Sequence, residues 1–442
     1  MSIFFQLIWP VLILLGFVAT FGLSFDLVGF SFLLTTTQSA LFLGLSATRR
    51  ASLLLLYWIF AFTFLGLIPW LHYTKGVTIW RSSAIAPATY VDVNLMIFFS
   101  GFATFVAHNL AFRKRSRSVA KHFSITRPQL TAFLLVALAG LGFLGVLYIN
   151  NFNPRLLFFR GLLGETREAV FTSSSSALVF GMLTRLAPPF AFYFAATELH
   201  RHRFLQLFLF AVVLLAVFPT GVARYFVAYT YIPILMIMLP AMRRGTNFAL
   251  TLLLSLLVVF PFLDQFRYYS ASEKISLLPT ETFFFAAHFD AYENFASAFE
   301  AHFISDGYQL LGALLFFVPR SFWPAKPVGS GFEMADRLGY IFNNISMPFL
   351  GEGYVNFGIV GVILFGLVIG YLMGRADRTL GPRANLNSRL NYQNTVYYFL
   401  FGGVFFVFRG DLLSSFAYLS AGLVVSWSIG AILRAINSKR CR

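Results

Sequence analysis

Several basic side chains stand at the ends of apolar segments of this chain. Arg224 follows the turn residue Gly221 by three positions, Arg409 closes an apolar segment, and Arg267 follows one closely. A guanidinium group binds phosphate oxygens bidentately and keeps its charge at every working pH. We therefore predict a shared site for a phosphate or pyrophosphate group, built from Arg224, Arg267, Arg320, Lys326, Arg409, Arg185 and Arg167.

Arg185 stands out in this set because it lies within an apolar segment. It is about eight residues from the start, or roughly 12 Å deep at 1.5 Å per residue, and Pro188 and Pro189 follow it. An ionisable residue at that depth indicates a functional site, and prolines are tolerated where a helix lines a polar cavity. The alternative is that these cations anchor to lipid headgroups or pair with acids. For Arg409, the nearby Asp411 is the expected structural partner.

Three side chains are candidates for taking a proton from a hydroxyl group, in the order Asp290, His288 and Glu352. A carboxylate or an imidazole within hydrogen-bond reach of a hydroxyl can act as a general base. If residues 288–293 are helical, Asp290 and Glu293 share one face of the helix, whereas His288 lies off that face. Surface helices often carry such residues without catalytic function, so a purely structural role is the alternative.

Other kinds of chemistry lack a sequence signal. The chain has no Gly-x-x-x-x-Gly-Lys-Ser/Thr phosphate loop, no HExxH, no Asp-x-Asp and no Gly-x-Ser-x-Gly, which argues against ATP-driven, zinc-protease, metal-dependent sugar-nucleotide and serine-hydrolase activities. Its single cysteine, Cys441, allows no internal disulfide and no cysteine-based metal cluster. We therefore expect no metal and no cofactor.

The composition identifies the elements that must position these residues. Of 442 residues, 58% are hydrophobic and only 11% are charged, whereas soluble domains carry about 25% charged residues. A membrane-spanning helix needs roughly 20 apolar residues. We predict an all-α, polytopic membrane bundle of about twelve transmembrane helices, near residues 3–22, 27–45, 51–69, 93–112, 129–149, 177–197, 204–220, 222–240, 247–263, 355–374, 393–409 and 411–434.

The segments between these helices alternate in charge. One set is rich in Lys and Arg and holds only two acidic residues, Glu198 and Asp377, while the other holds the remaining acids. Because basic loops stay on the cytoplasmic side, both termini are predicted to be cytoplasmic. The net charge of +16 is then a topology signal, and a nucleic-acid partner is not expected.

One connecting segment, residues 264–354, is much longer than the others and falls on the outer side. A structureless loop of that length is uncommon unless it is functional. Its apolar stretches, Thr282–Ala287 and Tyr308–Val318, are too short to span confidently, so we predict amphipathic or re-entrant helices on the outer surface. The chain is thus divided into helices one to nine (1–263), a large loop with substrate and catalytic residues (264–354), and helices ten to twelve with a cytoplasmic tail (355–442).

Three stretches carry a resemblance to a known family. The run Leu315–Pro327, the segment Gly351–Gly358 leading into an apolar helix, and Arg409-Gly410-Asp411 near the last helix resemble bacterial O-antigen polymerases of the Wzy type. Arg320, followed eleven positions later by Gly331, also matches a spacing described for such polymerases. A second copy of that spacing, expected in the preceding outer loop of some members, is not evident.

The resemblance implies a glycosyltransferase of the bacterial inner membrane, acting at the periplasmic face. Such polymerases join oligosaccharide repeat units carried on undecaprenyl pyrophosphate, moving the growing chain onto a hydroxyl of the next lipid-linked unit. Cations would stabilise the leaving pyrophosphate, and one of Asp290, His288 and Glu352 would accept the proton. Membrane lipids and a chain-length regulator protein are the other partners implied.

The sequence leaves two further functions open. An O-antigen ligase would use the same donor, with lipid A–core as acceptor, and the Pro319–Pro327 run favours the polymerase over it. A flippase or transporter of the lipid-linked oligosaccharide would carry charged residues deep in several spans. Arg185 is the one such residue in the predicted spans, which disfavours transport.

Overall fold

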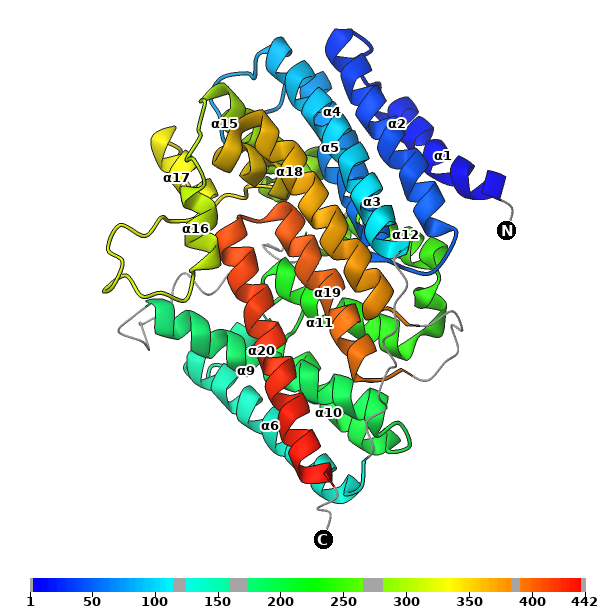
Figure 1. Ribbon diagram of the computed structural model, residues 1–442, viewed down its shortest axis with the longest axis vertical. Helices are drawn as coiled ribbons and strands as arrows, with labels where there is room; N and C mark the ends of the chain where they lie inside the picture. The colour runs from blue at the N-terminus through cyan, green and yellow to red at the C-terminus, as the bar shows by residue number, and fades with distance from the viewer. Residues whose placement is uncertain (1–2, 114–124, 159–173, 265–280, 383–389, 439–442) are drawn as a thin grey trace.

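A computed structural model describes residues 3–113, 125–158, 174–264, 281–382 and 390–438. Over these ranges the chain is all-helical, with 77% helix and no strands. Eight of the described helices are long and apolar enough to cross a membrane, which confirms a helical bundle of membrane-protein type (Figure 1).

A helix lies at each of the twelve predicted apolar segments. The helices are α1 (Ile3–Phe21), α2 (Leu27–Ala47), α3 (Leu53–Phe60) continued by η1 (Ala61–Leu67) and α4 (Ile68–Lys75), α5 (Pro87–Arg113), α6 (Pro128–Ile149), α9 (Ser174–Glu198), α10 (Arg203–Ala216), α11 (Arg224–Met238), α12 (Gly245–Leu254) continued by η4 (Ser255–Val259) and α13 (Phe260–Asp264), α18 (Phe349–Thr379), α19 (Tyr392–Arg409) and α20 (Leu412–Asn437).

Helices α5 and α18 pack side by side and run parallel. Small residues let their backbones approach closely, since a Cβ on Gly370 would lie 2.3 Å from the carbonyl oxygen of Thr104. Thr104 also donates a hydrogen bond to the carbonyl of Gly366, at 3.1 Å. Helix association in a bilayer depends on such packing and hydrogen bonding because lipid tails are as apolar as the side chains.

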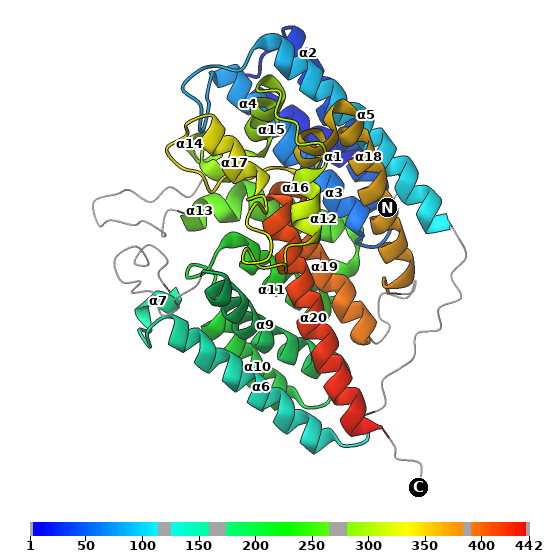
Figure 2. The same cartoon turned by 60° about the vertical axis from the view of Figure 1, so that its left-hand side comes forward.

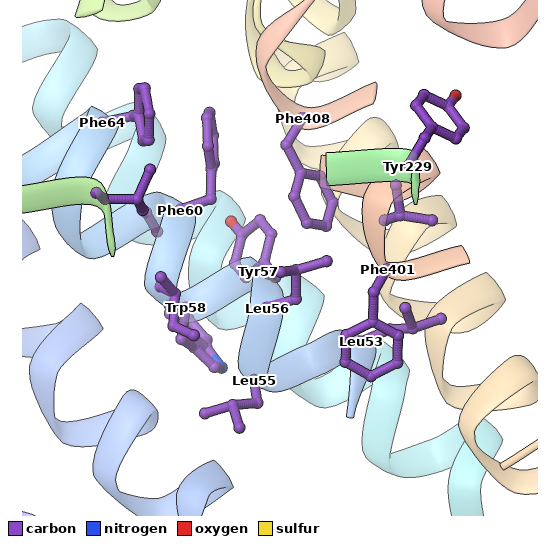
Figure 3. Packing of buried hydrophobic residues seen from close by; sticks show 14 of the residues in the cluster. Leu53, Leu55, Leu56, Tyr57, Trp58, Phe60, Phe64, Tyr229, Phe401 and Phe408 are labelled. Carbon is purple, nitrogen blue, oxygen red and sulfur yellow. The ribbon is translucent and has the colours of Figure 1, made fainter. Parts of the chain in front are cut away.

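The helix that α3, η1 and α4 form together is the centre of the bundle, and its whole apolar window is buried. Figure 3 shows Tyr57 and Phe60 of α3 beside Phe408 of α19, with ring centroids 5.4 and 5.6 Å apart. Aromatic pairs at these separations favour edge-to-face and tilted geometry. This contact fixes the end of α19 that carries Arg409.

A second group of helices, α6, α9, α10 and α20, lies beside the first (Figure 2). Here α6 and α9 are in close contact, because a Cβ on Gly145 would lie 2.2 Å from the side chain of Thr184. Helices α11 and α19 connect the two groups, since both contact α9 and each other. Arg185 of α9 is thereby brought next to α11.

Buried polar residues tie the helices together at the end where α18 finishes. Asp377 is 1% exposed and accepts hydrogen bonds from the Leu53 backbone at 2.9 Å and the Tyr397 hydroxyl at 2.7 Å, while the His108 ring lies 2.8 Å away. Arg50 donates to the Asp377 carbonyl at 2.7 Å. We refer to this as the Asp377 end.

The long segment folds at the opposite end, which we call the α15 end. It forms α14 (Glu281–Phe284), η5 (Ala287–Phe289), α15 (Ala291–Glu300), α16 (Tyr308–Leu314) and α17 (Ser330–Arg337). Helix α14 overlaps the predicted apolar stretch Thr282–Ala287 and α16 lies within Tyr308–Val318, while α15 and α17 are additions to that prediction. Helix α18 begins at Phe349, so Glu352 sits in its first turn rather than in a loop before it.

Candidate functional site

Helix α15 organises the site because its two acidic side chains, and that of Asp290 at its N-terminal cap, bind neighbouring segments. Glu293 accepts hydrogen bonds from the backbone N–H groups of Ile79, Trp80 and Arg81, at 2.6, 2.8 and 3.2 Å. Glu300, two turns further on, accepts from the backbone of Ala86 at 2.8 Å. The connection between α4 and α5 is therefore held against α15.

Asp290, at the N-terminal cap of α15, is 1% exposed and accepts five hydrogen bonds. The donors are Trp80 Nε1 at 2.9 Å, Asn294 Nδ2 at 3.0 Å, the backbone N–H and hydroxyl of Ser346 at 3.3 and 2.6 Å, and Arg409 Nη2 at 3.0 Å. A carboxylate offers about four lone-pair positions. Both Asp290 oxygens are thus fully used by the protein itself.

Arg409, at the end of α19, is fixed by three acceptors of one segment. Its Nε donates to the carbonyl of His288 at 2.8 Å, and its Nη2 donates to the carbonyl of Ala287 at 3.1 Å and to Asp290 Oδ1 at 3.0 Å. The side chain is 28% exposed. No described residue accepts a hydrogen bond from its Nη1, so as far as the described ranges go one edge of the guanidinium is available to a ligand.

The partner of Arg409 differs from the one predicted. Asp411 was expected to pair with it, but the ion pair forms with Asp290. The Asp411 side chain instead accepts from the backbone of Ser414 at 3.0 Å and caps α20. A helix N-terminus offers unpaired N–H donors, which a carboxylate at the cap satisfies better than a competing contact elsewhere.

Glu352 contacts the α19–α20 turn, which we define as residues 409–412. It is 2% exposed and accepts from the backbone N–H of Leu412 at 2.7 Å and from the hydroxyl of Ser330. The turn therefore brings Glu352 into the same region as Arg409 and Asp290.

His288 is half-buried between two aromatic rings. Its ring centroid is 4.6 Å from those of both Phe283 and Phe289, and its backbone carbonyl is the acceptor for Arg409 Nε. The three predicted acid–base candidates and Arg409 are thus gathered around one turn.

Arg224 and Arg185 lie close to this region. Arg224 is the first residue of α11, and the next residue, Tyr225, stacks on Phe406 of α19 at 4.5 Å. The Arg185 guanidinium lies 5.7 Å from the ring of Phe226. The turn before Arg224 packs tightly, since a Cβ on Gly221 would lie 1.8 Å from the Leu157 carbonyl oxygen of α7 (Arg155–Phe158).

Arg320 and Lys326 behave differently, because each binds carbonyls of its own loop. Arg320 donates to the carbonyls of Lys326 at 2.6 Å and Pro327 at 3.3 Å, and Lys326 donates to those of Phe316 at 2.5 Å and Val318 at 3.1 Å. The two remaining members of the predicted set, Arg267 and Arg167, lie outside the described residues.

Burial and hydrogen bonding shift the pKa of several groups at the α15 end. Burial raises the pKa of Glu293 above its ordinary value of 4.5, although three backbone N–H groups oppose the shift. Burial also acts to raise the pKa of Glu300, but hydrogen bonds from Ala86 and Arg81 leave it below 4.5. Burial lowers the pKa of Lys326, with the nearby Arg320 contributing.

Two other features bear on ligands. Among the described residues, no group of three His, Cys, Asp or Glu side chains is placed to hold a metal ion. An apolar groove of about 640 Å³ lies between α5 and α18, lined by Leu95, Phe99, Phe102, Phe299 and Ile359 among others. Phe299 belongs to the last turn of α15, whereas Asp290 precedes the first.

Some residues of the site were not identified from the sequence. Trp80, Asn294 and Ser346 hold Asp290, and Ser330 holds Glu352. Asn294 had a local signal, since it lies four residues after Asp290 and so on the same helix face. The others come from segments far away in the chain, and neither spacing nor composition points to them.

No protein-family model, curated protein or solved structure matches this chain.

Proposed function

We propose that this chain is a metal-independent glycosyltransferase that polymerises lipid-linked oligosaccharide repeat units, as the resemblance to O-antigen polymerases implies. In this proposal all twelve apolar helices cross the bacterial inner membrane and both termini are cytoplasmic. The α15 end then faces the periplasm, where the undecaprenyl-pyrophosphate donor and acceptor meet.

The observation that carries the proposal is the fixed guanidinium of Arg409. Three protein acceptors orient it, and within the described part of the chain nothing accepts a hydrogen bond from Nη1. Preorganised donors stabilise developing charge without reorganising during the reaction. In the transfer, an acceptor hydroxyl attacks the anomeric carbon of the donor, the carbon–oxygen bond to the pyrophosphate breaks, and the lipid pyrophosphate leaves with the bonding electrons toward Arg409.

We assign the proton-accepting role first to His288 and then to Glu352. Asp290, the first candidate from sequence, already accepts five hydrogen bonds, so its role in this proposal is to position Arg409. The imidazole of His288 lies on the segment that Arg409 binds, and a neutral imidazole is a suitable base near neutral pH.

Arg224 and Arg185 complete the anion site in this proposal. Both are near the Tyr225–Phe406 stack, next to the end of α19 that carries Arg409. The apolar groove between α5 and α18 is the candidate path for a polyprenyl tail. Phe299 in its lining lies about 14 Å along α15 from Asp290, at 1.5 Å per residue.

Substitution of Arg409 tests the proposal. Arg409→Ala should reduce chain extension by about 10²- to 10³-fold, the usual effect of removing one charge-stabilising donor. The measurement is the lipopolysaccharide ladder of a deletion strain complemented with the variant, with the membrane-inserted protein quantified by immunoblot.

Arg337→Ala is the matched control, because Arg337 lies at the same end and its side chain is 56% exposed in a pair with Glu333. It should retain long chains. Long chains in the Arg409→Ala strain would overturn the proposal. In the deletion strain, one repeat unit on the core supports a polymerase, whereas a bare core with lipid-linked polymer accumulating would indicate a ligase.

A further inference from the structure

The depth of α16 in the bilayer follows from its contacts with α18. Helix α18 has a break at Phe357 and Gly358, and the stretch from Gly358 to Thr379 is about 33 Å long at 1.5 Å per residue. This matches the ~30 Å of hydrocarbon that a span must cross, and Arg375 and Arg378 lie near the other end. The break in α18 therefore lies near one edge of the hydrocarbon.

Helix α16 begins at that same edge. The backbone N–H of Gly307 donates to the carbonyl of Asn356 at 2.9 Å, and that of Leu310 donates to Asn356 Oδ1 at 2.7 Å. Beyond α16, the ring of Phe316 lies 6.1 Å from that of Phe416, in the second turn of α20. Both contacts place α16 and the start of its following loop at the depth where α18 and α20 leave the hydrocarbon.

One face of this segment is strongly apolar and uncovered. Leu311 and Leu314, which share a face of α16, are 45% and 50% exposed, and Phe317 and Phe322 in the following loop are 66% and 84% exposed. The opposite face of α16 is buried, with Ala313 packed in a cluster that includes Leu412 of α20. Figure 1 shows α16 and the loop after it at the edge of the molecule.

The loop after α16 also satisfies its own backbone with cationic side chains. Lys326 and Arg320 together donate to four carbonyls, those of Phe316, Val318, Lys326 and Pro327. Irregular backbone is costly in an apolar medium unless its polar groups are bonded internally. Arg320 is also exposed, so its positive charge complements the phosphates of lipid headgroups.

We propose that α16 and the loop 315–326 form an interfacial anchor that inserts into the outer leaflet of the bilayer. Leu311, Leu314, Phe317 and Phe322 enter the acyl region, while Arg320 and Lys326 remain at the level of the lipid phosphates. Insertion of this segment is independent of the catalytic activity proposed above, whereas the choice of the outer leaflet rests on the orientation proposed there. The anchor assigns these two cations to the bilayer rather than to the substrate pyrophosphate.

Spin labelling in lipid nanodiscs tests this anchor. In a Cys441→Ser background, single cysteines at Leu314 and Phe322 are labelled, and their collision rates with oxygen and with a water-soluble nickel complex are measured. Val360→Cys, on the exposed face of α18, is the lipid-facing standard, and Ser82→Cys, exposed in the α4–α5 connection, is the aqueous standard.

The anchor predicts oxygen-to-nickel ratios at Leu314 and Phe322 close to that at Val360 and far above that at Ser82. Ratios like that of Ser82 would show a water-exposed surface and overturn the proposal. Low collision rates with both reagents would show burial against a second copy or another protein and would also overturn it. Leu311→Cys and Phe317→Cys supply replacement sites if either first variant fails to fold, and the readout does not depend on activity.

Discussion

At the residue scale, the site is built from charged side chains that form several hydrogen bonds each with other parts of the protein. Asp290 and Arg409 form a mostly buried ion pair in which each partner has additional hydrogen bonds. A buried ion pair of this kind gives specific geometry more than stability, because desolvation offsets much of the attraction. Removing one partner nevertheless leaves the other with unsatisfied polar groups.

Asp290→Asn should therefore destabilise the protein and remove the ion pair that Arg409 forms with Asp290. The amide keeps one acceptor oxygen but presents an NH₂ group where Asp290 now accepts other donors, and we expect a loss of roughly 2 kcal/mol. Thermal unfolding in detergent measures this loss.

A double-mutant cycle with Arg409→Gln should give a coupling energy of about 1–3 kcal/mol. Additive effects of the two substitutions would contradict a stabilising interaction between the two side chains.

The two glutamates of α15 predict opposite responses to acid. The folded-state pKa of Glu300 is lowered, so its stabilising contribution is complete above pH 4.5 and is lost as pH falls through that lowered value. The folded-state pKa of Glu293 is raised, so its contribution increases as pH falls from that raised value toward 4.5.

Unfolding midpoints measured from pH 7 to pH 3 check these signs. Glu300→Gln should flatten the decline in stability below pH 4.5. Glu293→Gln should remove the increase in stability that occurs as pH falls from the raised pKa of Glu293 to 4.5. Identical profiles for the two variants would show that the assigned shifts are wrong.

At the element scale, close backbone approach sets the positions of the helices that carry the site. Gly370 leaves no room for a side chain against Thr104, whereas Gly140 of α6 has nothing within 4 Å of its Cβ position. The parallel pair of α5 and α18 places Glu352 at the α15 end and Asp377 at the other.

Gly370→Ala should destabilise the bundle by about 1–3 kcal/mol, because overpacking forces α5 and α18 apart. Gly140→Ala is the matched control, and it should be neutral or stabilise by up to ~1 kcal/mol through helix propensity. Thermal unfolding in detergent separates the two. Equal effects at both positions would mean that the α5–α18 contact is not tight.

The sequence predicted the apolar helices well because their signal is local, and it predicted the α15 end poorly. Helix α15 has no apolar run that would predict its burial. Asp290, Glu293 and Asn294 around its first turn are polar, and they are buried because they form hydrogen bonds with other segments. Local reasoning paired Arg409 with its neighbour Asp411. The true partner, Asp290, is 119 positions away, which spacing along the chain cannot indicate.

At the scale of the whole molecule, the helices are arranged in two groups joined by α11 and α19. Arg409, at the end of a connecting helix, lies where the long segment crosses the end of the bundle. The charge distribution further predicts that the α15 end and the C-terminus face opposite sides of the membrane.

Cysteine labelling in intact spheroplasts checks that orientation. The native Cys441 should react with a membrane-impermeant maleimide only after the inner membrane is opened. A cysteine at Ser82, in a Cys441→Ser background, should react without opening. Labelling of Cys441 from outside would reverse the predicted topology.

The way in which Glu293 holds the α4–α5 connection has a mechanical consequence. Its carboxylate engages three successive backbone N–H groups, while Trp80 reaches Asp290. Those amides should exchange their hydrogens as slowly as the amides within the helices, and proteases should not cleave the chain at these three residues. We expect this connection and α15 to move as one unit, so a gate that admits a substrate should open through other segments.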